Sequence, residues 1–367
     1  MTKHKSLMKY AQAAGWLALT CAIATGSFQA AWLRAAPGEQ AGSSKPAFTL
    51  PRGLQSSPIV VPPDNPMTAG KIKLGEQLFF DKRLSRTKMM SCETCHVPEK
   101  GWTDSLALSP RFDGSMNTRH TPTLYEAAYY PDLYWDGRAK GLEAQILAAW
   151  RGQMGADPDA IAKEVDAVAA YNKAFVAELG GPATAQRVVQ ALATFVRTIH
   201  AGDTPWDRTA QDAASLKKTE AGRGFQVFAD VTHCTNCHLP PLFTDTLFHN
   251  IGIGMDREKP DMGRGQILSD TATKASQPVT EEMKKLLGAF KTPTLRGAVL
   301  SGPYFHDGRT ATFEEAVDLA VKGGIKTANL DEKMQAWTVT PTQRKELLAF
   351  LRSLTPATKP YPRPKLP

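Results

Sequence analysis

The segment Cys92–His96 reads CETCH, and the segment Cys234–His238 repeats the same pattern as CTNCH. The pattern Cys-x-x-Cys-His is typical of covalent attachment of a c-type haem. The two thiols add to the two vinyl groups of one porphyrin, and the adjacent histidine binds the iron. Together the copies use every cysteine except Cys21. We therefore expect two covalently bound haem c groups, whose attachment and axial residues are Cys92, Cys95, His96, Cys234, Cys237 and His238.

Two other kinds of site use a Cys-x-x-Cys pair. A thioredoxin-like redox pair needs a βαβ pattern around it, and the flanking sequence has none. An all-cysteine zinc site needs two pairs that are distant in sequence to meet, and it leaves His96 and His238 without a role. Haem attachment is therefore the favoured interpretation.

The N-terminus has the pattern of a secretory signal. Three lysines within the first nine residues precede an apolar run at 11–24, which small residues follow. We expect residues 1–36 to form a signal peptide that is cleaved between 26 and 36. An uncleaved anchor through Leu33 is the alternative, and the polar residues that interrupt the run disfavour it. Export combined with haem attachment indicates the bacterial periplasm, with no stable membrane insertion.

The formal charge of +8 gives a misleading impression of the mature chain. Half of it comes from the four basic residues of segment 1–36, which has no acidic residue. The remaining sequence has no cluster of lysine and arginine, so nucleic-acid binding is not expected.

The chain from residue 67 onward is an internal duplication. Matched landmarks recur in the same order: GEQLF at 75–79 and GFQVF at 224–228, TPTL at 121–124 and 292–295, WDGR at 135–138 and HDGR at 306–309, and FVRTI at 195–199 and FLRSL at 350–354. Such a repeat indicates two copies of one structural unit. We predict two units at 67–215 and 216–355, an extended segment at 37–66 before them, and a Pro-rich tail at 356–367.

The closing segment of each unit is predicted to be helical. Apolar residues between 188 and 199 follow the i, i+3, i+4, i+7 spacing of an amphipathic helix. In the second unit Thr340 is a predicted N-cap, and Pro341 suits the first helical position. Gly75 and Gly224 are expected to let two helices cross closely in each unit. Strand-like alternation is nearly absent, so the predicted fold class is all-α.

From about Met67 to Leu354 the chain resembles the bacterial di-haem cytochrome c peroxidase and MauG family. The resemblance rests on FDKRLS at 80–85, TPTL at 121–124, WDGR at 135–138, FKTPTLR at 290–296 and PYFHDG at 303–308. It implies two cytochrome c-like domains with haems near their interface and a calcium ion between the domains. The first haem is expected to react with hydrogen peroxide, and the second to deliver electrons.

The resemblance also assigns roles to single residues. Trp135 stands at the family tryptophan between the haems, where the alternative role is core packing. His306 stands at the family histidine of the second domain's loop, where the alternative is a hydrogen-bonded structural histidine. Gln145 matches a glutamine on the distal side of the first haem.

Four positions depart from the family pattern. Gln153 stands where the family has a distal glutamate, and an amide hydrogen-bonds peroxide but does not transfer protons. Segment 97–119 has no histidine to block the first iron, so an open, five-coordinate first haem is expected. Ala320 replaces a methionine or tyrosine ligand of the second haem. His120 replaces a calcium-binding asparagine, which makes the ion doubtful. The second haem is then expected either to be five-coordinate or to recruit Met255, Met262 or His249 as its sixth ligand.

These observations predict a periplasmic di-haem oxidoreductase that reduces hydrogen peroxide with electrons from a cytochrome c or a cupredoxin. One alternative is MauG-like oxidation of a side chain on a partner protein. A second alternative is a non-catalytic di-haem electron carrier, which only the amide at Gln153 favours.

Overall fold

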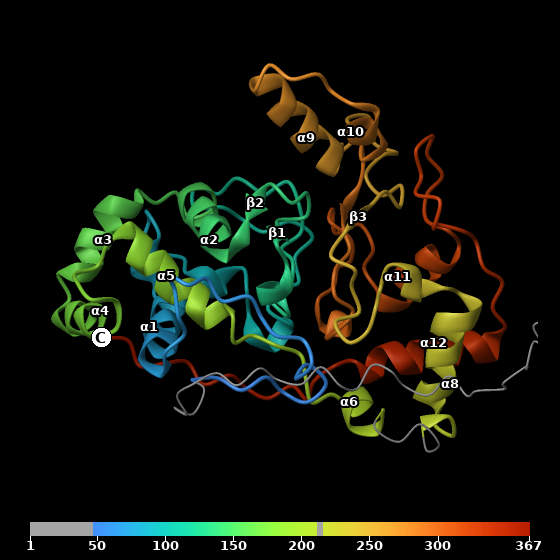
Figure 1. Ribbon diagram of the computed structural model, residues 1–367, viewed down its shortest axis with the longest axis horizontal. Helices are drawn as coiled ribbons and strands as arrows, with labels where there is room; N and C mark the ends of the chain where they lie inside the picture. Colours follow the sequence, from blue (N-terminus) through green and yellow to red (C-terminus); the bar gives the residue numbers. More distant parts are fainter. Residues whose placement is uncertain (1–46, 211–215) are drawn as a thin grey trace, which may run out of the picture. The chain divides into compact units, whose positions relative to one another are not determined.

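The computed structural model describes residues 47–210 and 216–367, which lie within one compact unit, Pro46–Pro367 (Figure 1). The predictions for the signal peptide and its cleavage fall outside the described residues. Among the residues that are described, no helix is long and apolar enough to cross a membrane.

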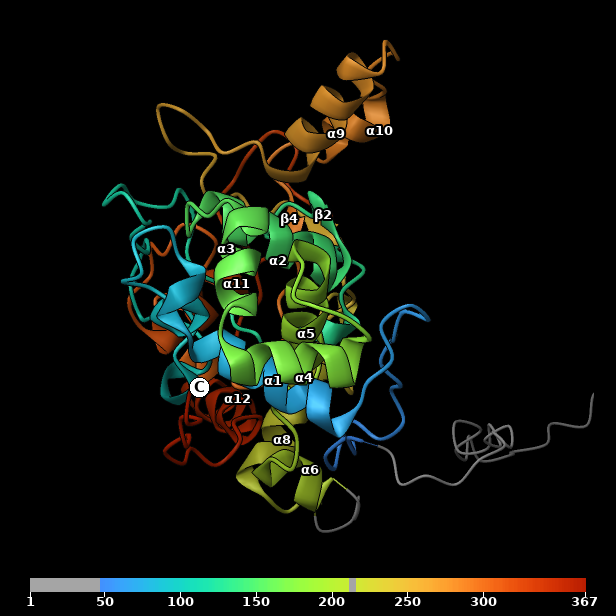
Figure 2. The ribbon, with the colours of Figure 1, turned by 90° about the vertical axis from the view of Figure 1, so that its left-hand side faces the viewer.

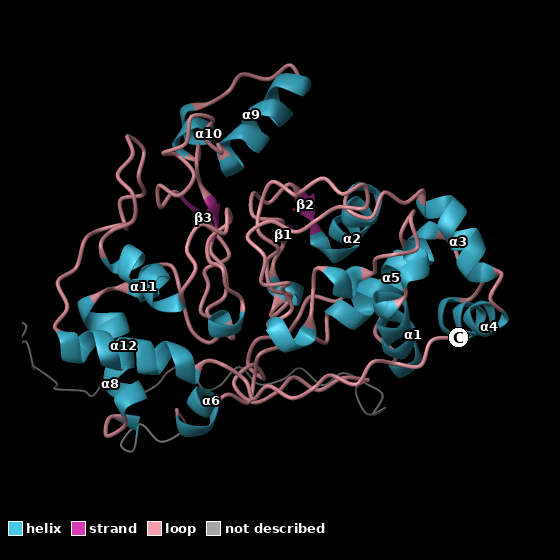
Figure 3. Cartoon of the chain, turned by 180° about the vertical axis from the view of Figure 1, so that it is seen from behind, coloured by secondary structure: helices cyan, strands magenta, loops and turns pink. Residues whose placement is uncertain are grey.

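Helices and loops make up most of the described chain, with four two-residue strands in two small antiparallel pairs (Figure 3). The helices are α1 (Ala69–Phe80), α2 (Gly141–Gly152), α3 (Pro158–Asp166), α4 (Ala169–Leu179), α5 (Ala185–Val196), α6 (Pro205–Thr209), α8 (Glu220–Gln226), α9 (Gly263–Lys274), α10 (Glu281–Lys285), α11 (Phe313–Val321) and α12 (Pro341–Ser353). The strands are β1 (Asp132–Leu133) with β2 (Ala139–Lys140), and β3 (Phe248–His249) with β4 (Phe290–Lys291). The helix-rich fold class predicted from the sequence is confirmed.

Each half of the repeat has its own hydrophobic core. The first core gathers buried side chains between Leu74 and Ala201, and the second gathers those between Trp206 and Leu354. In the first, α1 packs against α4 and α5 (Figure 2). In the second, α8 packs against α12. The equivalent elements of the two sequence copies therefore occupy equivalent places, although the domain limits at 215 and 355 remain a prediction.

The paired glycines bring the two helices of each half into close contact, as predicted. A Cβ atom at Gly75 of α1 would lie 2.0 Å from the carbonyl oxygen of Ala191 in α5. A Cβ atom at Gly224 of α8 would lie 1.9 Å from the carbonyl oxygen of Glu346 in α12. Both obstacles are backbone atoms, so a larger residue would have to push the helices apart.

We expect Gly75→Ala and Gly224→Ala each to lower the free energy of unfolding by about 1–3 kcal/mol, the usual range for overpacking. Chemical denaturation of each variant measures the effect. Gly152→Ala, at the end of α2, is the matched control because a Cβ there meets nothing within 4 Å. Loss of stability in the control as large as in the two variants would contradict the proposed cause.

The two closing helices form as predicted. Thr340 caps α12 by accepting a hydrogen bond from the backbone N–H of Gln343, and Pro341 occupies the first helical position. The side chain of Thr184 caps α5 in the same way. Helix α5 ends at Val196, three residues before the end of the apolar spacing, and Ile199 is buried from the turn that follows.

Candidate di-haem site

The first haem-attachment loop holds its histidine through a backbone carbonyl. Cys92 begins a short 3-10 turn (η2, Cys92–Thr94), and the N–H of His96 donates to the Cys92 carbonyl at 3.0 Å. The Nδ1 atom of His96 donates to the carbonyl of Trp102 at 2.9 Å. This bond fixes the orientation of the ring and leaves Nε2 as the atom that the predicted iron ligand would use. Burial lowers the pKa of His96, which favours the neutral imidazole that binds iron.

The second loop repeats this geometry. Cys234 begins the 3-10 turn η6 (Cys234–Asn236), and the N–H of His238 donates to the Cys234 carbonyl at 2.9 Å. The Nδ1 atom of His238 donates to the carbonyl of Phe243 at 2.9 Å, and burial lowers the pKa of His238. Trp102 and Phe243, which supply the two carbonyls, both have a left-handed backbone, with φ of 61° and 53°. The duplication therefore extends to the hydrogen bond behind each predicted iron ligand.

The residues around these loops fit a covalently bound haem. All four cysteines are free thiols, and burial raises the pKa of Cys92 to about 12. Gln145 and Gln153, which the family resemblance places near the first haem, and His306 of the second half each hold a buried polar atom without a partner among the described residues: Gln145 Oε1, Gln153 Oε1 and His306 Nε2. Polar atoms left unpaired in a protein interior are costly unless a bound group or water meets them.

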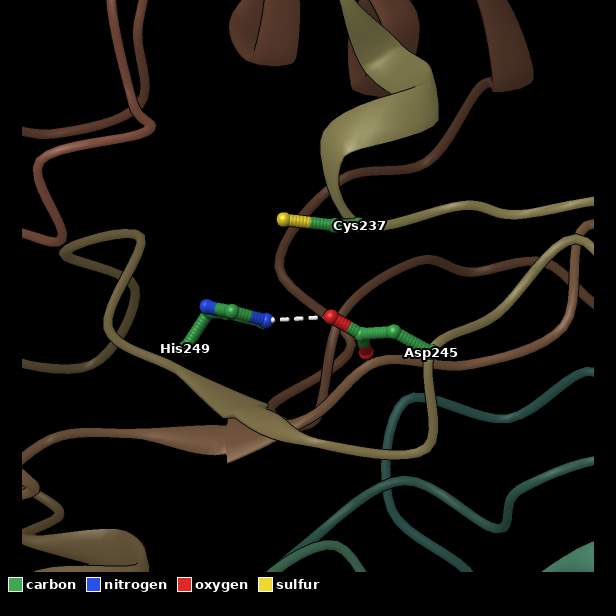
Figure 4. Close-up of side chains that lie close together, drawn as sticks. All are labelled: Cys237, Asp245 and His249. Atoms are coloured by element: carbon green, nitrogen blue, oxygen red, sulfur yellow. Dashed lines mark hydrogen bonds and ion pairs between the residues drawn. The ribbon is translucent and has the colours of Figure 1, made fainter.

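The zinc alternative is not supported within the described part of the chain. One group of potential metal ligands occurs there, formed by Cys237, Asp245 and His249, and it does not bring the two cysteine pairs together (Figure 4). His249 uses both ring nitrogens in this group. Its Nε2 atom lies 2.7 Å from Asp245 Oδ2, and its Nδ1 atom lies 2.6 Å from Asp331 Oδ2. Because the sequence predicts Cys237 to be a haem-attachment residue, we do not interpret the group as a separate metal centre.

The hydrogen bonds of His249 also bear on the second haem's sixth ligand. Burial alone would lower the pKa of His249, but its hydrogen bonds to Asp245, Cys237 and Asp331 raise it to about 10. A ring paired on both sides has no nitrogen left for iron. Ala320 is exposed on α11. The expectations that remain for the second haem are a five-coordinate iron, or Met255 or Met262 as its sixth ligand.

Trp135 joins segments of the two halves. Its Nε1 atom donates to the carbonyl of His120 at 2.8 Å, and its own carbonyl accepts from the N–H of Lys291 at 2.8 Å. Its ring lies 6.4 Å from the ring of His306, centroid to centroid. His306 stacks on Phe290 at 3.5 Å. The predicted site residues Trp135 and His306 therefore come together where the two halves meet.

His306 is held by stacking more than by polar contacts of its ring. Its Nε2 atom lies 3.8 Å from Asp261, beyond hydrogen-bond range. Burial lowers the pKa of His306 to about 4, so the ring is neutral at pH 7. The carboxylate of Asp261 instead pairs with the guanidinium of Arg119, which also contacts Asp136. This charged group ties the loop before Trp135 to the second half.

Comparison with known proteins gives the same family as the residues of the two loops. The model of the di-haem cytochrome c peroxidase family, which includes MauG, matches residues 69–215. MauG of Methylorubrum extorquens is 36% identical over 310 residues, covering 83% of this chain and 84% of that protein. Cytochrome-c peroxidase IdrP1 of Denitromonas iodatirespirans is 33% identical over 338 residues, covering 84% and 88%. The chain belongs to this family.

Solved structures agree with this membership. A MauG-like protein associated with microbial copper homeostasis matches with a TM-score of 0.72 and 27% identity, covering 87% of this chain and 96% of its own. The di-haem peroxidase BthA of Burkholderia thailandensis shares the fold, with a TM-score of 0.64 and 20% identity. Membership of the di-haem peroxidase family makes this chain a peroxidase-like enzyme with haem c as its cofactor.

The calcium ion that the family resemblance implies does not fit the residues present. His120 is buried, and its Nδ1 and Nε2 atoms face the carbonyl oxygens of Leu106 at 2.8 Å and Ser301 at 3.1 Å. A neutral ring donates to one of these carbonyls and a doubly protonated ring to both. Calcium binds oxygen ligands, and a ring N–H offers none. The imidazole therefore joins the two loops directly.

Tyr134 is a site residue that the sequence analysis missed. It has a left-handed backbone with φ of 62°, an uncommon conformation for a residue with a bulky side chain. The guanidinium carbon of Arg138 lies 3.4 Å from the centre of its ring. Burial raises the pKa of the Tyr134 hydroxyl, and the side chains of Arg138 and Gln145 oppose that rise. In the sequence, the only indication that Tyr134 lies near the predicted site is its position directly before Trp135.

Glu126 is the second missed feature. The residue is fully buried, its Oε1 atom accepts from the N–H of Ala201 at 2.8 Å, and its Oε2 atom has no partner among the described residues. Burial raises the pKa of Glu126 to about 8, although the nearby guanidinium of Arg296 opposes the rise. The carboxyl is therefore protonated in the folded protein at neutral pH.

This raised pKa predicts that the stabilising effect of Glu126→Gln grows with pH. In the unfolded chain the carboxyl ionises near pH 4.5, and in the folded chain near pH 8. Wild-type stability therefore falls as the pH rises through this window, at about 1.4 kcal/mol per pKa unit. Glutamine does not ionise and avoids the loss. Denaturation midpoints at pH 5 and pH 8.5 measure the difference, with exposed Glu281→Gln as the control. A constant difference between variant and wild type would contradict the burial argument.

Proposed function

We propose that this protein is a periplasmic di-haem c-type oxidoreductase that reduces hydrogen peroxide to water with electrons from a small redox protein. Cys92 and Cys95 would attach the first haem, and His96 would bind its iron. Cys234, Cys237 and His238 would hold the second haem in the same way. The observation that best supports this assignment is the matched His–carbonyl hydrogen bond in the two loops.

The residues of the chain position peroxide and the haem ligands. When bound, the first haem supplies the redox chemistry on peroxide, and the second supplies electrons. The unpaired buried Oε1 atoms of Gln145 and Gln153 would accept hydrogen bonds from the O–H groups of peroxide. Neither amide transfers a proton. The Tyr134 hydroxyl, which the Gln145 side chain contacts, is the proposed donor in place of the missing carboxyl.

Trp135 is the proposed route for electrons between the two halves. Its ring lies beside His306, and its polar groups bond to His120 and Lys291. These contacts fix the indole against both halves. The neutral ring of His306 positions the indole without adding charge.

Stopped-flow mixing of the holoprotein with peroxide tests the peroxidase assignment. The absorption maximum of the first haem is expected to shift, and reduced cytochrome c or cupredoxin to restore it. An unchanged spectrum would contradict the proposal.

Gln153→Glu restores a proton-transferring carboxyl and is expected to speed turnover by about 10²-fold, the low end for general acid–base catalysis.

Oxidation of a partner protein is the second candidate. Segment 97–119 has no histidine that could block the first iron, and this absence favours the second candidate. The resemblance to MauG implies that such an open first haem needs no reductive activation. This function predicts a peroxide-induced spectrum that small redox proteins restore slowly and that a specific secreted partner restores fast. The third candidate, an electron carrier, predicts two six-coordinate irons, so a high-spin ferric EPR signal near g ~6 contradicts it.

Calcium is not expected to be required. Adding a chelator to the wild-type holoprotein should change neither its spectrum nor its denaturation midpoint. His120→Ala should lower the free energy of unfolding by about 1–3 kcal/mol, because the buried ring is lost together with its contacts to the carbonyls of Leu106 and Ser301. His120→Asn supplies an oxygen ligand and is expected to make the midpoint calcium-dependent. A wild-type midpoint that falls on chelation would contradict this proposal.

A further inference from the structure

The Pro-rich tail after α12 returns to the first half of the molecule, where it lies against α1 and the first haem-attachment loop (Figure 1). The ring of Tyr361 stacks on Phe80 with centroids 5.7 Å apart. The same ring meets the edge of Trp102 at 5.4 Å. The tail therefore packs an aromatic side chain onto the core of the other half.

Polar contacts hold the tail in this place. The N–H of Tyr361 donates to Glu99 at 2.8 Å, and its hydroxyl donates to Glu76 of α1 at 2.7 Å. The guanidinium of Arg363 donates to Glu93 at 2.6 Å and to Glu99 at 2.7 Å. Glu93 lies between the two cysteines of the CETCH segment. Arg363 thus binds the haem-attachment turn itself.

Trp102 connects these contacts to the axial histidine. Its carbonyl accepts the Nδ1–H of His96, and it does so from a left-handed backbone that is strained for a tryptophan. Surrounding structure must hold such a conformation. The Trp102 ring is held by Phe79 and Phe195 of the first core and by Tyr361 of the tail.

The second half shows what the same motif looks like without a tail. Phe243 has the same backbone conformation and the same bond to its histidine. Its ring is fully buried and packs on Phe228 and Phe350, both from its own core. The first half obtains from the end of the chain part of the packing that the second half supplies itself.

We propose that the tail is a positioning element for the first haem: Tyr361 and Arg363 hold the loop from Glu93 to Trp102, so that the Trp102 carbonyl fixes the ring of His96. The effect is confined to one of the two haems. This inference rests on the proposed attachment of a haem at His96. It makes Tyr361 and Arg363 positioning residues, since neither contacts the predicted haem ligand directly.

Resonance Raman spectroscopy of the ferrous holoprotein tests this proposal through the iron–histidine stretching band of the first haem. In Tyr361→Ala, and in a chain that ends at residue 356, this band is expected to shift or broaden. Peroxide binding should slow by about tenfold, the low end for outer partners of metal ligands. The EPR signal of the second haem should stay unchanged, which gives an internal control in the same molecule.

Further variants separate the contributions of the tail. Tyr361→Phe keeps the ring on Trp102 and loses only the hydrogen bond to Glu76, so its effect should be smaller than that of Tyr361→Ala. Arg363→Ala should have a smaller effect than Tyr361→Ala, because its side chain is 36% exposed and surface ion pairs contribute little. Lys345→Ala removes the exposed ion pair with Glu220 in the second half, and it should leave both haems unaffected.

The proposal fails if Tyr361→Ala and the shortened chain keep the wild-type band and peroxide rate. It also fails if both haems change equally, because that result would indicate general loosening of the fold. The haem content of the wild-type protein separates failure of the proposed function from failure of the proposed role of the tail. Fewer than two haems per chain would overturn the proposed function, whereas two haems with an unchanged band would overturn only the role of the tail.

Discussion

A chain with alanine at both Cys92 and Cys95 is expected to carry one haem instead of two and to lose its spectral response to peroxide. Without the two thiols the first porphyrin has no covalent tether, and His96 alone holds it weakly. The Cys234–His238 loop lies in the other core and should bind its haem normally. Haem per chain, measured against protein mass, and stopped-flow absorption after peroxide addition give the two readouts.

The reciprocal variant is the control. Alanine at both Cys234 and Cys237 should also leave one haem per chain, but the response to peroxide should persist while turnover with an external donor is lost. If the two double variants respond equally to peroxide, the assignment of separate roles to the two haems is wrong. If both keep two haems, the thiols are not the attachment points.

Arg296→Met is expected to lower the free energy of unfolding by about 3–5 kcal/mol, the range for breaking a buried ion pair on one side. The side chain of Arg296 is 1% exposed, and it donates to both carboxylate oxygens of Asp207 at 2.8 Å. It also donates to the carbonyl of Ala201 at 3.0 Å and to that of Pro241 at 2.6 Å. Methionine fills the space but leaves the Asp207 charge buried without a partner.

Chemical denaturation of the holoprotein measures this loss, and Arg344→Ala serves as its control. Arg344 pairs with Asp318 at the surface, where its side chain is 40% exposed, so its removal should cost below about 1 kcal/mol. Similar losses in both variants would mean that burial of the pair is not the cause. Because Arg296 contacts Pro241, three residues after His238, the variant should also broaden the EPR signal of the second haem.

The sequence was sufficient for the parts of this fold that follow local rules. The CETCH and CTNCH segments, the helix cap at Thr340 and the close crossings at Gly75 and Gly224 each depend on chemistry within a few residues or on a repeat visible in the chain. The structure confirms the caps and crossings as predicted. The family comparisons confirm the recognition that the quoted motifs carried.

The remaining features arise from contacts between residues that are distant in sequence. Arg363 and Glu93 are separated by 270 positions, and no periodicity connects them. The two carbonyls that bond to His120 are backbone atoms, which the identities of Leu106 and Ser301 do not reveal. The burial of the Glu126 carboxyl depends on residues that surround it only in the folded core, so the local sequence does not reveal it. The predicted roles of Gln145, Gln153, Trp135 and His306 remain predictions that the experiments above address.

The acceptor behind each axial histidine is a main-chain oxygen, and this has an evolutionary consequence. Every amino acid contributes a backbone carbonyl, so no substitution at Trp102 or Phe243 removes this acceptor. Selection therefore acts on the rings of Trp102 and Phe243 that hold the backbone in its left-handed conformation. The two halves pack that ring differently, against Tyr361 of the tail in the first and against Phe350 of its own core in the second, while the histidine–carbonyl bond stays the same.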